Sequence, residues 1–438
     1  MKKLLVILCV LIIPACLFSQ HAAEDLSFNR FEDLWLSVQK NNPTKRVYDL
    51  NIQKAQWDFK VSKGFLYPTV AAGFTGQDNL VLATTPIPGE IFGQPGKIIY
   101  TQFGQKYVYN TGVTITQSLF DWQSNCQAQL AKNNIALSQV QGMAYEQTLK
   151  QQAAQFYYTA LIAKAAIHIS GQDLMIADSI AKIAAQRLQE GVIDAASANQ
   201  AMINYNSVLQ NQLQNKLLFE QSIQNLKILL GVQPADSIEL KEDIVLDAYK
   251  QMQDVAIGDD KNLLVYEAAL KNAKLQEKVQ RSATIPKLGL DNYLGEQQYR
   301  KDLGMSFSSG AWTPNQYLAL NLSVPIFTGF STKNKIRSAE TSARISEQQY
   351  KNAQLQSIQE DSLLLSSLAN NKMITAASER NFYLYHDNCR LVEQKYKEGV
   401  TSIDVYLKSF EDYLKAENAH LNNLAALYNN YSVIQSRR

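Results

Sequence analysis

Two stretches of the chain alternate apolar and polar side chains at every second position. From residue 107 to 119, one set of alternate positions is mainly apolar, and the other set, from residue 110, is Asn, Gly, Thr, Thr and Ser. From residue 318 to 326, one set is entirely Leu, Val or Ile. A period of two residues predicts β-strands with one apolar face. Each stretch has about ten residues, the length with which a tilted strand crosses a bilayer. The side chains expected to face lipid are Val113, Ile115, Leu318, Leu320 and Leu322.

Each of these strands has an expected partner that follows a proline. One partner covers 69–76, directly after Pro68, and the other covers 287–294, directly after Pro286. The loop 77–106 is long and holds three prolines, so we expect it to stay irregular and to face outward. The sequence therefore predicts two β-hairpins, over 67–120 and 285–327.

The rest of the chain reads as long helices. No proline lies between residues 96 and 233 or after residue 325, and these regions are rich in Ala, Gln, Leu, Lys and Glu. Such composition without proline favours helix. A capping pattern at Asn29 and Glu32 marks the expected start of the first helix. This first predicted helix ends at Asn41. The other predicted helices cover 44–66, 121–190, 195–230, 260–283, 331–398 and 402–435.

The last predicted helix carries a heptad seam. Apolar side chains recur at alternating spacings of four and three, which is typical of helices that pack side by side in coiled coils. Glu417 is the one seam position that is not apolar. The seam comprises Ile403, Leu407, Phe410, Leu414, Glu417, Leu421, Leu424, Tyr428 and Tyr431.

Short motifs recur in the same order roughly two hundred residues apart, which indicates an internal duplication. Gly64-Phe-Leu-Tyr-Pro68 matches Ser282-Ala-Thr-Ile-Pro286, and Arg187-Leu-Gln-Glu-Gly191-Val192 matches Lys395-Tyr-Lys-Glu-Gly399-Val400. Each copy would hold one hairpin and a set of helices. The predicted organisation is a signal peptide at 1–20, a first repeat at 29–232, a linker at 233–247 and a second repeat at 248–438.

The amino terminus predicts export from the cytoplasm. Two lysines precede an apolar run from Leu4 to Ile13, which is the pattern of a secretory signal peptide. A lipid anchor on Cys16 is an alternative that this pattern leaves open. The net charge of +2, without a run of Lys or Arg, gives no reason to expect nucleic acid.

Candidate chemistry is sparse. We expect Cys126 and Cys389 to be free thiols, because no spacing suggests a metal or redox site. The four histidines form no metal-binding spacing and accompany no nucleophile motif. Asp121 and Thr328, at strand-to-helix junctions, are expected to cap helices. We therefore predict no catalytic residue, no metal and no cofactor.

Four strands from one chain cannot close a barrel, since the smallest membrane barrels have about eight. An open sheet in lipid would leave backbone groups unpaired at its edges. Two interpretations remain. Several chains share one barrel whose polar faces line a lumen, or the protein is a secreted or periplasmic coiled-coil structural protein without a pore.

The ordered motifs resemble the TolC-like outer membrane efflux proteins over essentially the whole mature chain. The motifs that carry the resemblance include Ser118-Leu119-Phe120-Asp121, Pro325-Ile326-Phe327-Thr328-Gly329 and Ile403-Asp404-Val405. The resemblance implies a homotrimer with a shared twelve-stranded β-barrel, four strands per chain, continuous with a long periplasmic α-helical barrel. It implies a passive duct in the bacterial outer membrane that exports small molecules, metals or proteins. The implied partners are a periplasmic adaptor (membrane fusion protein) and an inner-membrane RND or ABC pump.

The resemblance also suggests site residues. Gly191, Val192, Gly399 and Val400 match the helical tips where the family docks its adaptor, although both glycines can simply serve a turn with positive φ. Tyr396 and Asp404 match positions that narrow the family's tube, and a ring of Asp404 carboxylates would favour cations. Asp404 can equally be an acid at a helix amino terminus, paired with Lys408.

Overall fold

A computed structural model describes residues 25–243, 248–251, 256–308 and 310–438. The predicted signal peptide and Cys16 lie outside these residues. The chain forms two compact units, and each unit combines segments from both predicted repeats. Unit 1 comprises 1–43, 149–256 and 366–436, and unit 2 comprises 44–148, 257–365 and 437–438.

The predicted helices are confirmed, with ends that differ by at most a few residues. The first helix begins at Phe31, and its N-cap residue Arg30 makes no side-chain capping hydrogen bond, so the capping pattern at Asn29 and Glu32 does not form. None of the helices in the described part of the chain is long and apolar enough to cross a membrane. The helices are α1 (Phe31–Asn41), α2 (Pro43–Ser62), α3 (Trp122–Gln189), α4 (Ala195–Leu230), α5 (Lys261–Ser282), α6 (Ser331–Lys397) and α7 (Ile403–Ser436).

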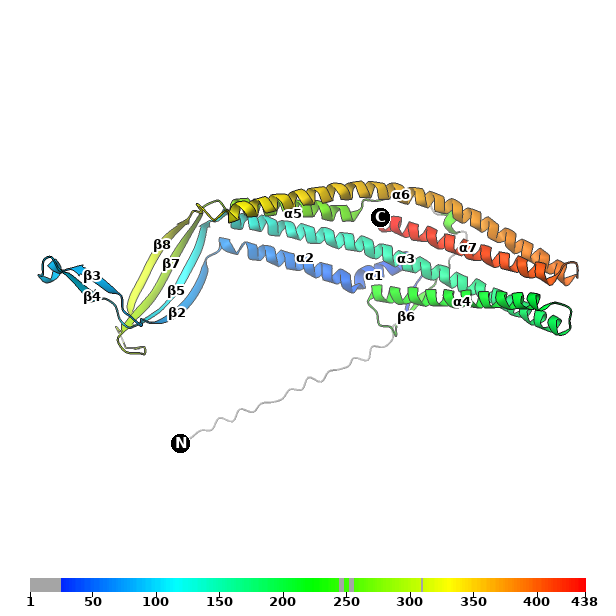
Figure 1. Ribbon diagram of the computed structural model, residues 1–438, viewed down its shortest axis with the longest axis horizontal. Coiled ribbons are helices and arrows are strands. Elements are labelled where there is room, and N and C mark those ends of the chain that lie inside the picture. Colours follow the sequence, from blue (N-terminus) through cyan, green and yellow to red (C-terminus); the bar gives the residue numbers. More distant parts are fainter. Residues whose placement is uncertain (1–24, 244–247, 252–255, 309) are drawn as a thin grey trace, which may run out of the picture. The chain divides into compact units, whose positions relative to one another are not determined.

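Unit 2 holds the sheet that the alternation predicts (Figure 1). Its four strands are antiparallel and lie in the order β2-β5-β7-β8. The last strand ends at Ser323, so the predicted strand residues 324–326 lie beyond it. Pro325 explains this early end, because proline has no N–H for a ladder hydrogen bond. The strands are β2 (Thr69–Asp78), β5 (Tyr107–Phe120), β7 (Lys287–Arg300) and β8 (Thr313–Ser323).

Two smaller β-structures were not predicted. The expected loop 77–106 contains a hairpin of β3 (Thr84–Pro88) and β4 (Ile98–Gln102). The predicted linker contains β6 (Ser237–Leu240), which pairs in parallel with β1 (Asp25–Phe28). Strands of four or five residues are too short to show a clear period in the sequence.

The helices of unit 2 repeat the order of the strands to which they connect. The rings of Tyr48 in α2 and Tyr145 in α3 stack with centroids 4.6 Å apart. The amide of Asn133 in α3 donates to Asn272 in α5 at 3.2 Å. Arg281 in α5 forms an ion pair with Glu340 in α6. Because each helix is joined to its strand by a short segment, the strand order β2-β5-β7-β8 imposes the helix order α2-α3-α5-α6 (Figure 1).

In unit 1 the last helix supplies much of the core. Its predicted seam is buried, apart from the half-buried Tyr431. Seam residues pack with Ala177 and Ile180 of α3, Val208 of α4 and Phe382 of α6. The α7 helix therefore contacts the second half of α3, α4 and the second half of α6, as the heptad pattern predicts for a helix packed side by side.

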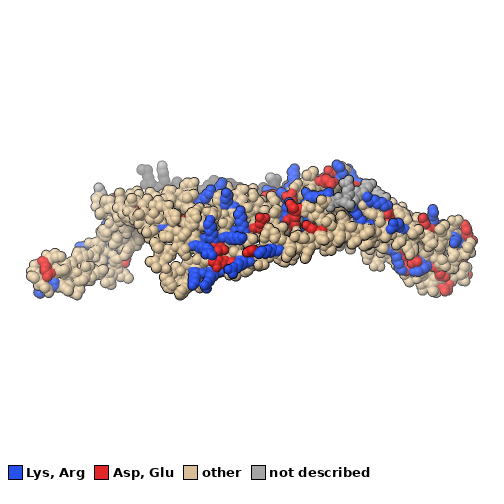
Figure 2. All heavy atoms as spheres, turned by 90° about the horizontal axis from the view of Figure 1, so that it is seen from above, with Lys and Arg blue, Asp and Glu red and all other residues tan. Residues whose placement is uncertain are grey.

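A basic surface covers part of unit 2. Figure 2, which looks onto the side of α5 and α6, shows Lys and Arg gathered over α5 and the first part of α6. The sequence shows no run of cations there, because the two helices that carry them are separated by both strands of the second hairpin. The exposed cations are Lys271, Lys274, Lys278, Arg281, Lys333, Lys335, Arg337, Arg344 and Lys351.

Candidate functional site: an amphipathic sheet and linked helical tips

The strand register gives the sheet two chemically different faces. Paired residues of neighbouring strands lie on one face. The row Val70, Ile115, Asn292 and Leu318 therefore shares a face, and Ala72, Val113 and Leu294 continue it. The opposite face carries the rows Thr114, Tyr293, Tyr317 and Thr116, Asp291, Ala319. All five residues predicted to face lipid lie on the first face, which we call the apolar face: Val113, Ile115, Leu318, Leu320 and Leu322.

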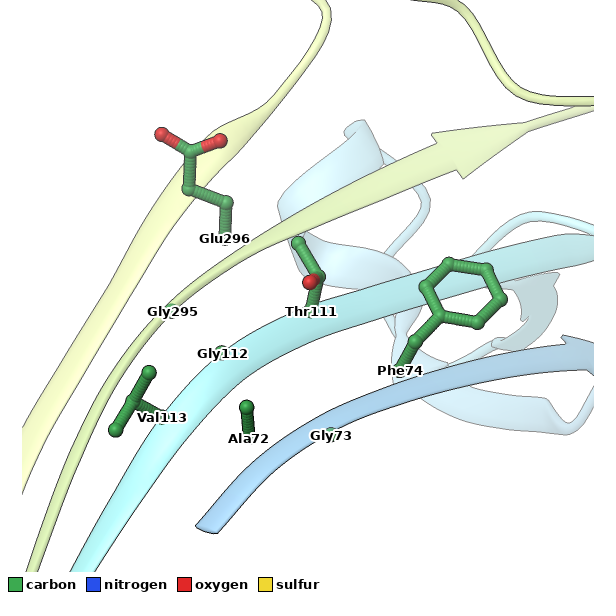
Figure 3. Close-up of a pocket in the computed structure, with 8 residues that line it drawn as sticks. All are labelled: Ala72, Gly73, Phe74, Thr111, Gly112, Val113, Gly295 and Glu296. Carbon is green, nitrogen blue, oxygen red and sulfur yellow. The ribbon is translucent and has the colours of Figure 1, made fainter. Parts of the chain in front are cut away.

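Three glycines cross the sheet in one row (Figure 3). Gly73 pairs with Gly112, and Gly112 pairs with Gly295. A Cβ on Gly295 would lie 2.5 Å from the Tyr293 ring, so the close approach of this ring requires glycine. Glycine in neighbouring strands permits the bending that curved sheets need. The row borders a hollow of about 480 Å³ in which Glu296 is the one titratable lining residue, so we assign it no chemistry.

The sheet has two open edges. Within the described residues, β2 and β8 each pair on one side only, with β5 and β7 respectively. The β2 side chains are exposed along the whole strand. Unpaired backbone groups on long strands are a template for pairing with another strand. We therefore expect each edge strand, β2 and β8, to pair with a strand from outside this sheet.

The two predicted tips have the same backbone structure. Val192 N–H donates to the Arg187 carbonyl at 2.9 Å and Gly191 N–H to that of Leu188 at 3.0 Å. Val400 and Gly399 make the equivalent bonds to the carbonyls of Lys395 and Tyr396. Both glycines have positive φ, of 70° and 75°. This is the Schellman motif that ends helices.

The valine after each glycine remains exposed. Val192 is 64% exposed and Val400 is 71% exposed. In many Schellman motifs this position packs on the preceding helix turn. Here both side chains are available to a partner, whereas the glycines serve the turn.

Asp404 links the two tips of one chain. Its carboxylate accepts a hydrogen bond from the Ser197 hydroxyl at 2.5 Å. Ser197 N–H in turn donates to the N-cap residue Asp194 at 2.8 Å, which orders the start of α4. Lys408, the alternative partner from the sequence, pairs instead with Asp412 and Glu411. The structure thus places Asp404 at a contact between α4 and α7.

Tyr396, the other predicted gate residue, lies one helix away in α6. Its ring stacks on Tyr406 of α7, with centroids 5.5 Å apart, and Arg187 lies over the ring at 4.9 Å. Within the described residues, its buried hydroxyl has no hydrogen-bond partner. Tyr396 and Asp404 therefore belong to the packing of the tips, but no direct contact between them is recorded in the described structure.

A buried carboxyl pair joins α3 to α7. Asp173 is 3% exposed and Glu417 is 5% exposed. The Tyr413 hydroxyl donates to one oxygen of Asp173 at 3.2 Å. Among the residues that the structure describes, none donates to the other oxygen of Asp173 or to one buried oxygen of Glu417. A single proton held between the two carboxyls would supply the missing donor, because two interacting buried carboxyls cannot both ionise cheaply.

The environment of this pair favours the protonated form. Burial, and after it the charge of Asp173, raises the pKa of Glu417 to about 9. Burial also raises the pKa of Asp173, while its hydrogen bonds with Glu417 and Tyr413 oppose this rise. The pair was not predicted from the sequence as a site. The signal was present, since Glu417 is the one polar position in the α7 seam.

The remaining candidates are structural. Asp121, directly before α3, accepts the Ser124 N–H at 3.0 Å and pairs with Lys287 at 3.1 Å, so this predicted cap is confirmed. Thr328 accepts the Thr332 N–H at 3.3 Å, but it lies three residues before the start of α6 and is not its N-cap residue. Cys126 and Cys389 are free, the first buried and the second half-buried. Among the described residues no cluster of His, Cys, Asp or Glu could hold a metal ion.

The sequence profile described as "Outer membrane efflux protein" matches residues 36–232 and 254–436. The chain belongs to this family.

Similar proteins support the assignment. The probable efflux pump outer membrane protein TtgC of Pseudomonas putida is 24% identical over 86% of this chain and 76% of its own. Protein CyaE of Bordetella pertussis is 24% identical over 73% of this chain and 69% of its own. The open-state outer membrane channel MtrE of Neisseria gonorrhoeae has the same fold, with a TM-score of 0.74 and 19% identity over 93% of this chain and 88% of its own.

Proposed function

We propose that this protein is the outer-membrane channel of a tripartite exporter. Three copies would share one β-barrel of twelve strands, four from each chain, continuous with an α-helical barrel in the periplasm. The observation that carries the proposal is the four-stranded sheet with one apolar face and two open edges. In lipid such a sheet is tolerated only if its edges pair, and β2 of one copy pairing with β8 of the next closes a ring.

The polar face of the sheet would then line the lumen. It carries Thr, Asn, Tyr and Asp side chains, whereas the apolar face carries mainly Val, Ile and Leu, with Asn292 and Gln117 among them. We propose that the protein acts as a passive duct and not as an enzyme. A role in efflux is supported by relatives such as TtgC, which is described as a probable efflux pump outer membrane protein.

The helical tips would dock the other components. We infer that Val192 and Val400, exposed beside the turn glycines Gly191 and Gly399, contact a periplasmic adaptor. The adaptor would connect the duct to an inner-membrane pump driven by protons or ATP. Asp404 and Tyr396 would narrow the lumen close to these tips. Exported substrates would be small molecules, metals or proteins, according to the pump.

The internal duplication gives this proposal a simple origin. Apart from the β3–β4 hairpin inserted in the first copy, the order helix, strand, strand, long helix, helix occurs twice, as α2-β2-β5-α3-α4 and as α5-β7-β8-α6-α7. The long helices have 68 and 67 residues and the last helices 36 and 34. We propose that the two repeats at 29–232 and 248–438 arose from one ancestral unit.

One substitution pair tests the channel. Leu320→Lys places a charge on the apolar face and should prevent heat-labile trimers from forming in the outer-membrane fraction, because a lysine facing lipid costs about 2–4 kcal/mol near the bilayer centre. Asn321→Lys, one position along β8, is the control. Asn321 lies on the opposite face and donates to Asp291 at 2.6 Å, so lysine there meets a carboxylate.

The alternative is a secreted or periplasmic coiled-coil protein without a pore. In that case the wild-type chain would be found as a monomer in the periplasmic fraction, and both variants would fold in solution without detergent. That result would rule out the channel.

A further inference from the structure

The β3–β4 hairpin is a well-formed element and not an open loop. Gly89 N–H donates to the Lys97 carbonyl at 2.7 Å, and Gln94 N–H donates to the Gly89 carbonyl at 2.8 Å. A Cβ on Gly89 would lie 2.3 Å from the Gln94 carbonyl oxygen, so only glycine fits this turn. At the base, Asn79 N–H donates to the Lys106 carbonyl at 2.7 Å. The hairpin is therefore preorganised between a closed base and a tight tip.

One face of this hairpin is apolar and uncovered. Pro86 pairs with Tyr100 and Pro88 pairs with Ile98, so these four side chains share a face, which we call the hairpin outer face. Ile98 is 65% exposed and Tyr100 is 70% exposed. An isolated two-stranded hairpin is only marginally stable in water, and an exposed apolar patch marks a contact site.

The two prolines restrict how the hairpin can associate. Proline has no N–H to donate, so Pro86 and Pro88 fit the pairs whose N–H groups point away from β4. The outer edge of β3 thus lacks donors at both positions. A ring of hairpins joined edge to edge would need β4 of one copy to pair with β3 of the next. The prolines disfavour that ring. The hairpins can then associate by packing their outer faces against one another.

The hairpin lies at the end of the sheet where β2 ends and β5 begins, away from the helices of unit 2 (Figure 1). Its arms have five residues each, which gives a length of roughly 17 Å. A closed barrel of twelve strands, tilted by about 40°, has a radius of roughly 12 Å. In the proposed trimer each hairpin could therefore reach the central axis.

The hairpin also carries almost no net charge. From residue 80 to residue 105 the charged side chains are Glu90 and Lys97. Three identical copies can approach one another without electrostatic repulsion, and a homotypic contact needs no complementary partner surface.

We propose that the hairpin outer faces of three copies of this chain pack against one another over the external mouth of the channel. The contact covers the apolar side chains of Ile98 and Tyr100 and forms an apolar constriction above the lumen. This inference rests on the proposed trimeric channel. It adds an external closure, separate from any narrowing at the periplasmic tips.

Disulfide formation between subunits tests the contact. In a chain whose Cys126 and Cys389 have been replaced, Tyr100→Cys and Ile98→Cys should each give cross-linked dimers after mild oxidation of outer membranes. Thr85→Cys, on the opposite face of the same hairpin, is the matched control and should stay monomeric in denaturing gels. The geometry is demanding, since Cα atoms must lie within about 7 Å.

A second measurement does not depend on cysteine. Replacing residues 82–104 by a short Gly-Ser linker should raise the single-channel conductance of reconstituted trimers by roughly twofold or more, because an apolar constriction resists water and ions. Heat-labile trimers in the same membranes show that the channel itself is intact.

The outcomes separate the two proposals. Intact conducting trimers without cross-links at positions 98 and 100, and with unchanged conductance after hairpin removal, would refute the hairpin contact and leave the channel standing. Cross-links to a different outer-membrane protein would also refute it. If the wild-type chain formed no trimers in outer membranes, both proposals would be refuted.

Discussion

Glu417 occupies the single polar position of an apolar seam, and its environment makes it a proton-holding group. The folded state keeps a proton that the unfolded chain releases above pH 4.5, because burial raises the pKa of Glu417 to about 9. Stability from this group is therefore complete below pH 4.5 and is lost as the pH rises towards 9. The groups that face it are Asp173 of α3 and Tyr413 of α7.

This sign leads to a pH prediction. The thermal midpoint of the wild-type protein should fall between about pH 6 and about pH 9, and Glu417→Gln should flatten that fall because glutamine does not titrate. Circular dichroism at 222 nm would measure both. Glu411→Gln is the control, since Glu411 pairs with Lys415 and its pKa is lowered. An equally steep fall in Glu417→Gln would refute the shared proton.

Asp404 can act through its charge or through its hydrogen bond, and two substitutions separate these roles. Ser197→Ala removes the donor to Asp404 and keeps the carboxylate, whereas Asp404→Asn removes the charge. If a ring of carboxylates narrows the duct, Asp404→Asn should weaken cation block of reconstituted trimers several-fold, and Ser197→Ala should leave it near the wild-type value. Unchanged block in Asp404→Asn would leave Asp404 as a link between α4 and α7.

At the scale of elements, the two tips present the same apolar side chain on the same turn. Val400→Asp should abolish capture of the adaptor, because a carboxylate would have to be desolvated in the contact. Val400→Leu keeps an apolar side chain and should preserve capture. A photo-reactive amino acid at position 192 in living cells would identify the captured protein by mass spectrometry. Equal capture by the Asp and Leu variants would place the docking surface elsewhere.

Element boundaries were predictable to within a few residues wherever the pattern was long. The 68-residue α3 and the 14-residue β5 each repeat one local pattern many times. The β3–β4 hairpin was missed, because two of its five β3 residues are prolines, which normally argue against a strand. The same prolines remove two N–H donors from the outer edge of β3.

At the scale of the whole molecule, the open edges of the sheet require strands from other chains, and the proposed trimer specifies how many chains the particle holds. Four strands per chain need additional copies to close, and three copies give twelve strands. Co-expression of tagged and untagged chains should give purified particles with none, one, two or three tags, which native mass spectrometry resolves. Particles with at most one tag would contradict the shared barrel.

The sequence alone determined the strands, the helices and the apolar and polar faces of the sheet. Their side-chain periods, of two or of about 3.6 residues, depend only on residues that are close together in the chain. Tertiary structure alone decided which distant side chains meet. Asp173 and Glu417 are far apart in the chain, as are Ser197 and Asp404, and the cations of α5 and α6 come from helices separated by a hairpin. No periodicity encodes such contacts, since they depend on the order in which strands pair and on how long helices then align.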